Sequence, residues 1–109
     1  MKVYLGIDIG SEEHALHFLD HEGREVQDKL KIANDEEGFS QAAEEIGKLD
    51  RTYQELLLKV GIESTGDYWR NIFSFLNSLD LSGKIEITMI NPNRKQKLKK
   101  SDLIKTKTD

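Results

Sequence analysis

One continuous apolar run limits the fold of this chain more than any other feature. Residues 55–65 read ELLLKVGIEST and lie between two segments with helical periodicity. A strand that is apolar on both faces is typical of the centre of a parallel sheet, where helices cover it. The run therefore predicts a buried central strand of an α/β domain, and this strand ends in polar residues from Glu63 onward.

Three shorter strand patterns precede the central run. Residues 2–9 alternate between two faces, which predicts a strand whose core face carries Val3, Leu5, Ile7 and Ile9. Residues 14–20 and 24–32 predict two further strands, joined by the turn DHEG at 20–23. Because the connections are short, we expect these three strands to form an antiparallel meander.

Two amphipathic helices flank the central strand. We expect the first over about 35–50, with Asn34 as its N-cap, and the second over about 67–80. A fifth strand is expected at 84–92. Right-handed βαβ crossovers then give a mixed five-stranded sheet in the order 3-2-1-4-5, with the first and fourth strands parallel.

The composition fits one soluble domain. The chain has 109 residues, of which 37% are hydrophobic and 33% charged, and this is enough to bury a core. It has no Cys, which excludes disulfides and Cys-ligated zinc and is consistent with a reducing compartment. No apolar run approaches the roughly 18 residues of a membrane helix, and we see no signal peptide. We therefore expect no membrane partner.

Two carboxylates end neighbouring strands of the predicted sheet. Asp8 lies late in the first strand, and Glu63 ends the fourth. The carboxyl ends of parallel neighbours meet at one edge, where open α/β sheets bind ligands. Two carboxylates roughly 5 Å apart repel unless a cation lies between them. We expect a Mg²⁺ site, with Mn²⁺ as a substitute, to which Asp109 would add a third ligand. Alternatively, Asp8 caps the Gly10–Ser11 bend and Glu63 is a surface residue.

The three histidines do not predict a zinc site. His14 and His17 point to opposite faces of a strand, and His21 falls in a turn. We expect all three at surface and edge positions.

The end of the chain carries the opposite charge from its body. Residues 1–93 hold 9 Lys and Arg against 18 Asp and Glu, whereas residues 94–109 hold 7 against 2. A basic tail over 93–109, helical at about 92–100, favours contact with a polyanion, although a solvated helix face is the simpler alternative. Because the sequence ends on a typical helix start, we expect a missing helix to follow. The candidate nucleic-acid-binding residues are Arg94, Lys95, Lys97, Lys99, Lys100, Lys105 and Lys107.

Four short motifs in order resemble one family. "GID" on the first strand, "EST-G-Y-W" after the fourth, "INPN" after the fifth and "KTKTD" at the end resemble the DEDD transposases of insertion sequences. This group includes the Piv invertase and the bridge-RNA-guided recombinases. The resemblance covers the whole chain as the N-terminal domain of a longer protein, and it implies a fold similar to RuvC resolvase, a ribonuclease H-like domain.

The resemblance also implies function. The first three acids of the family match Asp8, Glu63 and Asp109, while the fourth acid and the Ser-bearing C-terminal domain are not in this chain. It implies a nuclease-type Mg²⁺ centre used in DNA transposition, incomplete here, so that we expect the 109 residues alone to be inactive. Implied partners are DNA, a guide RNA in some members and further copies of the full-length protein, in the cytoplasm of a prokaryote. One departure is Ser11-Glu12-Glu13, where many members have a basic residue.

Two other functions remain open from the residues. "GIDIGS" also reads like the phosphate loop of an actin-like ATPase or sugar kinase, but that class does not account for Glu63 or for the Lys-rich end. A non-catalytic nucleic-acid-binding module would use the tail alone, with structural acids.

Overall fold

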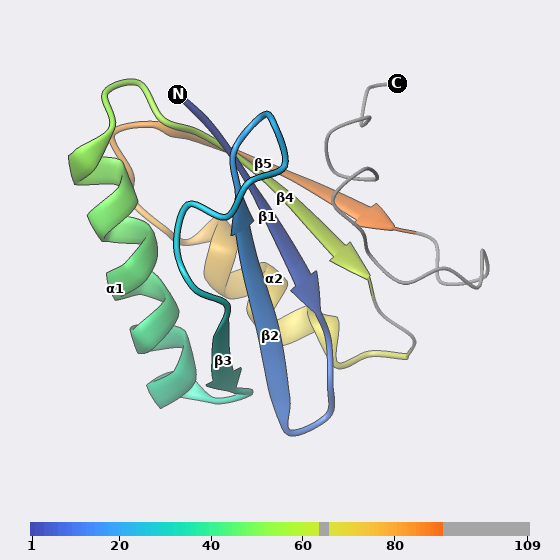
Figure 1. Ribbon diagram of the computed structural model, residues 1–109. Coiled ribbons are helices and arrows are strands. Elements are labelled where there is room, and N and C mark those ends of the chain that lie inside the picture. Colours follow the sequence, from blue (N-terminus) through green and yellow to red (C-terminus); the bar gives the residue numbers. More distant parts are fainter. Residues whose placement is uncertain (64–65, 91–109) are drawn as a thin grey trace.

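The computed structural model describes residues 1–63 and 66–90 and contains five strands and two helices in that part of the chain (Figure 1). In chain order they are β1 (Lys2–Asp8), β2 (Glu13–Leu19), β3 (Leu30–Ala33), α1 (Glu36–Thr52), β4 (Leu57–Glu63), α2 (Trp69–Asn77) and β5 (Lys84–Ile90). Each element overlaps a segment predicted above. The predicted helix at 92–100 and the rest of the basic tail lie outside the described residues.

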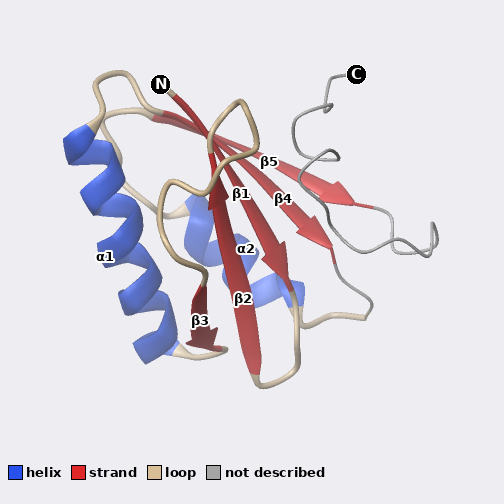
Figure 2. Ribbon diagram, in the orientation of Figure 1, coloured by secondary structure: helices blue, strands red, loops and turns tan. Residues whose placement is uncertain are grey.

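The strands form one mixed sheet in the order β3-β2-β1-β4-β5, as predicted (Figure 2). β1 and β2, and β2 and β3, pair antiparallel, whereas β4 pairs parallel with both β1 and β5. The chain therefore adopts an α/β fold of the ribonuclease H-like type. In the described part of the chain, no helix is long and apolar enough to span a membrane.

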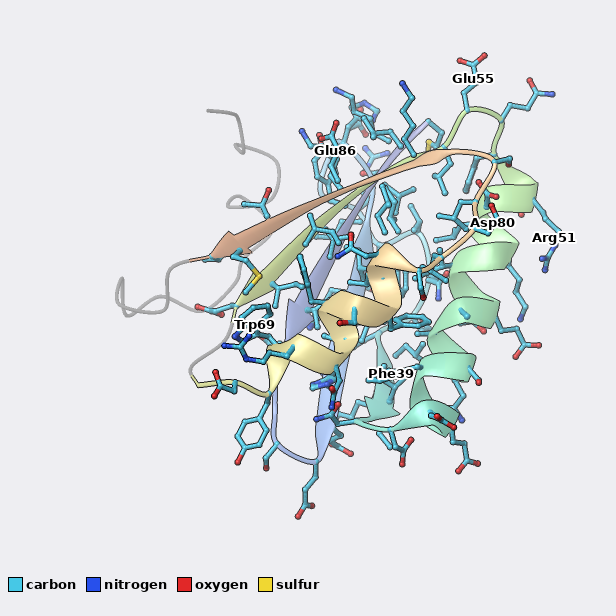
Figure 3. The ribbon with its side chains drawn as sticks, turned by 180° about the vertical axis from the view of Figure 1, so that it is seen from behind. Phe39, Arg51, Glu55, Trp69, Asp80 and Glu86 are labelled. Atoms are coloured by element: carbon cyan, nitrogen blue, oxygen red, sulfur yellow. The ribbon has the colours of Figure 1, made fainter. Side chains whose placement is uncertain are left out.

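Both described helices pack on the same face of the sheet (Figures 1 and 3). Their apolar stripes meet the alternate residues of β1, β2 and β4 in one core, which includes Leu5, Phe18, Ile46, Leu58 and Ile72. The opposite face carries the other alternate residues. The strand alternation read from the sequence therefore assigns the faces correctly, and Asp8 lies on the face away from the helices.

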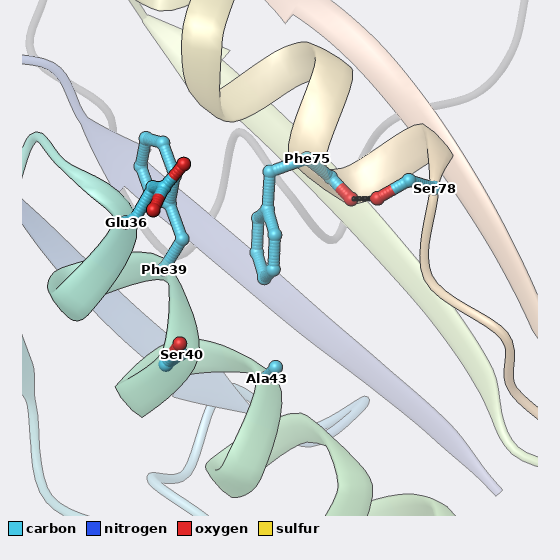
Figure 4. A pocket seen from close by; sticks show the side chains of 6 residues that line it. All are labelled: Glu36, Phe39, Ser40, Ala43, Phe75 and Ser78. Carbon is cyan, nitrogen blue, oxygen red and sulfur yellow. Dashed lines mark hydrogen bonds between the residues drawn. The ribbon is translucent and has the colours of Figure 1, made fainter.

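α1 and α2 also contact each other through aromatic rings. The Phe39 and Phe75 rings stack with their centroids 5.2 Å apart and their planes at 14°. Both rings line a shallow groove of about 360 Å³ between the helices (Figure 4). The Ser78 hydroxyl donates to the Phe75 carbonyl oxygen at 2.7 Å at the end of α2. This groove belongs to the helix layer, on the other side of the sheet from Asp8.

The third strand is shorter than predicted. The structure has β3 at Leu30–Ala33 instead of 24–32, with an isolated bridge between Leu19 and Glu25. Between that bridge and the Leu16–Leu30 pair, residues 26–29 lie opposite only two residues of β2. The surplus residues bulge out of the ladder, as an insertion on one strand must. A period-two pattern cannot reveal this interruption.

The cap of α1 also differs from the prediction. The N-cap is Asp35, whose carboxylate accepts from the Gly38 N–H at 2.9 Å, and not Asn34. Both residue types cap helices well, so sequence preference alone could not decide between them. The Asn34 side chain instead donates to the Ser11 carbonyl oxygen at 3.4 Å and so reaches the turn between β1 and β2.

Candidate metal centre

Asp8 and Glu63 lie side by side at the carboxyl ends of two parallel strands. They are Cα partners in the register of β1 and β4, so their side chains leave the same face of the sheet. Parallel neighbours are spaced about 4.8 Å apart. The Asp8 side chain is 50% exposed, and Glu63 is partly buried. The parallel pairing predicted for these two strands is thus confirmed, and its register brings the two carboxylates together.

The rest of this row across the sheet is apolar. Ala15 of β2 is the Cα partner of Asp8, and Ile90 of β5 is the Cα partner of Glu63. The two carboxylates therefore lie between two side chains that offer no charge and no hydrogen bond. Carboxylate oxygens are the ligands that Mg²⁺ prefers, usually one or two of them with water completing the shell. The donor set of this pair fits that ion.

The next row on the same face contains two glycines. Gly6 of β1 pairs with Gly61 of β4, and the row continues to His17 on one side and Thr88 on the other. Neither central strand has a side chain at this level. The carboxylates of the row above therefore have no side-chain neighbour from β1 or β4 directly beneath them.

His17 is a neighbour of the pair that the sequence analysis missed. Its Nε2 lies 4.0 Å from Oδ2 of Asp8, and its side chain is 37% exposed. In the observed register, odd-numbered residues of β2 share a face with even-numbered residues of β1. Without the register, that relation could not be assigned, because a one-residue slip moves His17 to the other face.

The other histidines do not join this site. His21 is exposed in the turn, with its Nε2 3.8 Å from a Glu22 carboxylate oxygen. His14 is 1% exposed within the core, so its predicted surface or edge position is wrong. Among residues 1–63 and 66–90, no three His, Asp or Glu side chains lie close enough together to hold a metal ion. The described part of the site is thus a pair of carboxylates.

The remaining predicted site residues lie outside the described part of the chain. These are Asp109 and the basic residues Arg94, Lys95, Lys97, Lys99, Lys100, Lys105 and Lys107.

The connection from Glu63 to α2 shows a tight turn and an aromatic helix start. Gly66 has φ +79°, a left-handed conformation that glycine adopts without strain. Tyr68, the N-cap of α2, makes no side-chain capping bond. The Arg70 guanidinium lies 4.9 Å from the centre of the ring of Trp69, the first residue of α2, and 3.3 Å from the Asp67 carboxylate. The first-turn N–H groups of α2 therefore have no side-chain cap from Tyr68.

The fold and the carboxylate pair define the structural class of this domain, and the sequence defines its family. The domain is a ribonuclease H-like α/β unit with acids on the adjoining ends of its two central parallel strands. The family follows from the sequence: the model of the DEDD transposases of the IS110 type, described as "Transposase", matches residues 5–109. The chain belongs to this transposase family, whose members act on DNA. A search of curated proteins gives no match.

Solved structures give only distant likenesses. Two structures of an Aquifex aeolicus Ppx/GppA family member are 13% and 17% identical, with TM-scores of 0.40 and 0.41, and each aligns with 81% of this chain. The ethanolamine utilization protein EutJ from Carboxydothermus hydrogenoformans is 14% identical over 77% of this chain, with a TM-score of 0.40. The chain spans only 35–36% of the length of these proteins. At such values the likenesses decide nothing about fold or function.

Proposed function

We propose that this chain is the metal-binding N-terminal catalytic domain of a longer DNA transposase. Asp8 and Glu63 bind Mg²⁺, which Mn²⁺ can replace, and Asp109 supplies a third carboxylate. The observation that carries the proposal is the register of β1 and β4, which sets two carboxylates side by side in a chain of the DEDD transposase family. Two carboxylates on adjoining strands disfavour each other's charge, and a bound cation would offset that repulsion.

The two strands fix the backbone positions of these acids. Each of the two strands is hydrogen-bonded to a neighbouring strand on both sides, since β1 lies between β2 and β4, and β4 lies between β1 and β5. The Ile9 N–H also donates to the Glu63 carbonyl oxygen at 3.4 Å, which extends the pairing beyond Asp8. A bound divalent ion would orient a DNA phosphate and stabilise the charge that develops on it during displacement. The role of the protein is to hold the ligands rigidly for that ion.

The basic residues from Arg94 to Lys107 contact the phosphate backbone of DNA in this proposal. The body of the chain is acidic, so a polyanion is favoured only at its basic end. Contacts of Lys and Arg with phosphates give affinity with little base specificity.

Metal binding is tested by thermal unfolding and calorimetric titration with Mg²⁺ and Mn²⁺. We expect the ion to raise the melting temperature of the wild-type chain. At an ion concentration of a hundred times the Kd, the free energy of unfolding should rise by about 2.7 kcal/mol. Asp8→Asn and Glu63→Gln should each lose this response. Glu86→Gln is the matched control, because Glu86 of β5 is a carboxylate on the same face of the sheet as Asp8 and Glu63, four register pairs away from the Glu63–Ile90 pair. Its variant should respond like the wild type.

Two results would contradict the metal proposal. One is a wild-type chain whose stability does not respond to either ion. The other is an equal response in all four proteins, which would place the ion elsewhere. ATP binding by the chain would instead support the actin-like ATPase alternative.

The proposed DNA interface is tested by the salt dependence of binding to a duplex. Replacing Lys95, Lys97, Lys99 and Lys100 together with Ala should weaken binding to all sequences. The slope of log K against log salt should fall by about 0.9 for every phosphate that the variant no longer neutralises. A quadruple variant with the slope of the wild type would show that the tail does not bind the backbone.

A further inference from the structure

His14 is a buried polar side chain at the start of β2, directly after the turn that follows Asp8. It lies on β2 with the core-facing residues Leu16 and Phe18, and it is 1% exposed. Its Nδ1 accepts a hydrogen bond from the Gly10 N–H at 3.2 Å. An accepting Nδ1 carries no proton, so the neutral ring must carry its proton on Nε2. Burial lowers the pKa of His14, which favours this neutral form, and the side chain of Asn34 partly offsets that effect.

The proton on Nε2 needs a buried acceptor. Nε2 of His14 and Oδ1 of Asn34 are both buried, and neither makes a hydrogen bond within standard geometry in the described part of the chain. The amide nitrogen of Asn34 donates to the Ser11 carbonyl oxygen at 3.4 Å, which turns Oδ1 away from that carbonyl. Unpaired buried polar atoms are rare because each costs free energy. A donor and an acceptor left over in one place are therefore natural partners.

The same two residues fasten the whole turn between β1 and β2. The Asn34 backbone N–H donates to the Glu12 carbonyl oxygen at 2.9 Å. At Gly10 there is no room for a side chain, because a Cβ would lie 2.5 Å from the Glu13 carbonyl oxygen. The turn is thus packed on itself and tied to the start of α1 through Asn34, which directly precedes the N-cap of that helix. Gly10 is only two residues beyond Asp8.

We propose that His14 and Asn34 form a clamp that positions Asp8 for metal binding. The neutral His14 ring bonds Gly10 through Nδ1 and Asn34 Oδ1 through Nε2–H, and so fixes the backbone that follows Asp8. His14 and Asn34 are positioning residues and do not touch the ion. The effect on metal affinity rests on the proposed function, whereas the clamp itself does not. This distinction allows the two ideas to be tested separately.

The clamp is tested by nuclear magnetic resonance on the whole chain. The His14 ring nitrogens should show a proton on Nε2, and the Gly10 amide should exchange slowly. In His14→Phe, which keeps a buried aromatic ring but removes both ring nitrogens, Gly10 exchange should rise at least tenfold relative to the amides of β4. Asn34→Ala, a milder change at a partly buried site, should also speed Gly10 exchange. A proton on Nδ1, or unchanged Gly10 exchange in both variants, would overturn the clamp.

The positioning of Asp8 is tested by Mg²⁺ titration of the same variants. We expect the Kd for Mg²⁺ to rise about tenfold in His14→Phe, the low end for partners outside the ligand shell. Leu16→Val is the matched control: it alters the next residue on the same face of β2, so it lowers stability without changing the Kd. His14→Gln, whose amide offers one acceptor and one donor, should regain part of the affinity.

The outcomes separate the clamp from the metal centre. An unchanged Kd in a folded His14→Phe variant would overturn the positioning role. An equal rise in Leu16→Val would do the same, because it would show an effect of stability alone. If the wild-type chain does not bind Mg²⁺ at all, the proposed metal centre fails, and the Gly10 exchange still decides whether the clamp exists.

Discussion

Asp50 offers a stability test with a defined pH dependence. Its carboxylate, near the end of α1, accepts from the Ser82 N–H at 2.8 Å, from the Ser82 hydroxyl at 3.0 Å and from the Gly83 N–H at 3.0 Å. These bonds join α1 to the residues directly before β5, where Lys84 N–H in turn donates to the Leu56 carbonyl oxygen. Losing Asp50 should therefore loosen the start of the edge strand β5.

The magnitude follows from the bonds and their exposure. Hydrogen bonds to a charged acceptor contribute about 1.5–3 kcal/mol each in favourable settings, but Asp50 is largely solvated. We discount the set to about 1–2 kcal/mol, because solvent screens exposed charges. For a domain of this size, Asp50→Ala should then lower the melting temperature by roughly 4–10 °C at pH 7. Asp50→Asn keeps an acceptor oxygen and should lose less.

The pH dependence has a fixed sign. The Ser82 N–H, above all, holds the pKa of the Asp50 carboxyl below its usual value of 3.8, with the Gly83 N–H and the Ser82 hydroxyl helping and desolvation opposing. A carboxyl with a lowered folded-state pKa stabilises the fold fully above its unfolded value. The contribution disappears as the pH falls through the lower folded value. The gap between wild type and Asp50→Ala should thus be constant from pH 7 to about pH 5 and narrow below about pH 4.

The assay is thermal or urea unfolding of both proteins across this pH range. Asp80→Ala is the matched control, because Asp80 is a carboxylate in the same connection to β5 (Figure 3). A gap that stays the same at pH 3, or an Asp80→Ala variant that behaves like Asp50→Ala, would refute the assignment.

Glycine replacements give further expected results, each measured by the free energy of unfolding. Gly38→Ala should destabilise by about 1–3 kcal/mol, because its Cβ would lie 2.0 Å from the Ala33 carbonyl oxygen. Gly47→Ala in the same helix meets only the Arg51 side chain at 3.2 Å and should stabilise by about 0.5–1 kcal/mol; equal signs for the two would contradict the packing. Gly66→Ala should cost about 1 kcal/mol from its φ of +79°, since no atom among the other described residues lies within 4 Å of the added Cβ; a stabilised variant would contradict that conformation.

Most of the fold could be predicted because buried residues recur in the sequence with the period of the strand or helix that carries them. The alternation in β1 and the apolar run at β4 set which strands are central, and the short connections set the meander. The bulge at 26–29 could not be predicted, because it is recognised only by comparing the number of residues on this strand with the number opposite them on β2. The cap of α1 could not be assigned either, since Asn34 and Asp35 are both good caps and a tertiary bond of Asn34 decides between them.

The candidate metal centre could be predicted only where the pairing of the strands could be predicted. Placing Asp8 beside Glu63 required the strand order alone, which the sequence supports. Finding His17 required the pairing of β1 with β2, and finding His14 in the core required knowing that the Gly10 N–H donates to its ring. Histidine is intermediate in its preference for burial, so its type does not indicate which of these environments it occupies.

The hydrogen bond of Gly10 also bears on why Asp8 is present. One explanation is that Asp8 caps the bend at Gly10 and Ser11. The Gly10 N–H, however, is bonded to the ring of His14, so the bend obtains that bond without the Asp8 carboxylate. The described contact of the Asp8 side chain is with His17 at 4.0 Å, on the other face of the hairpin from His14. A cap on the Gly10 N–H therefore does not account for Asp8, and a ligand at the end of β1 is the explanation that the Mg²⁺ titration puts to the test.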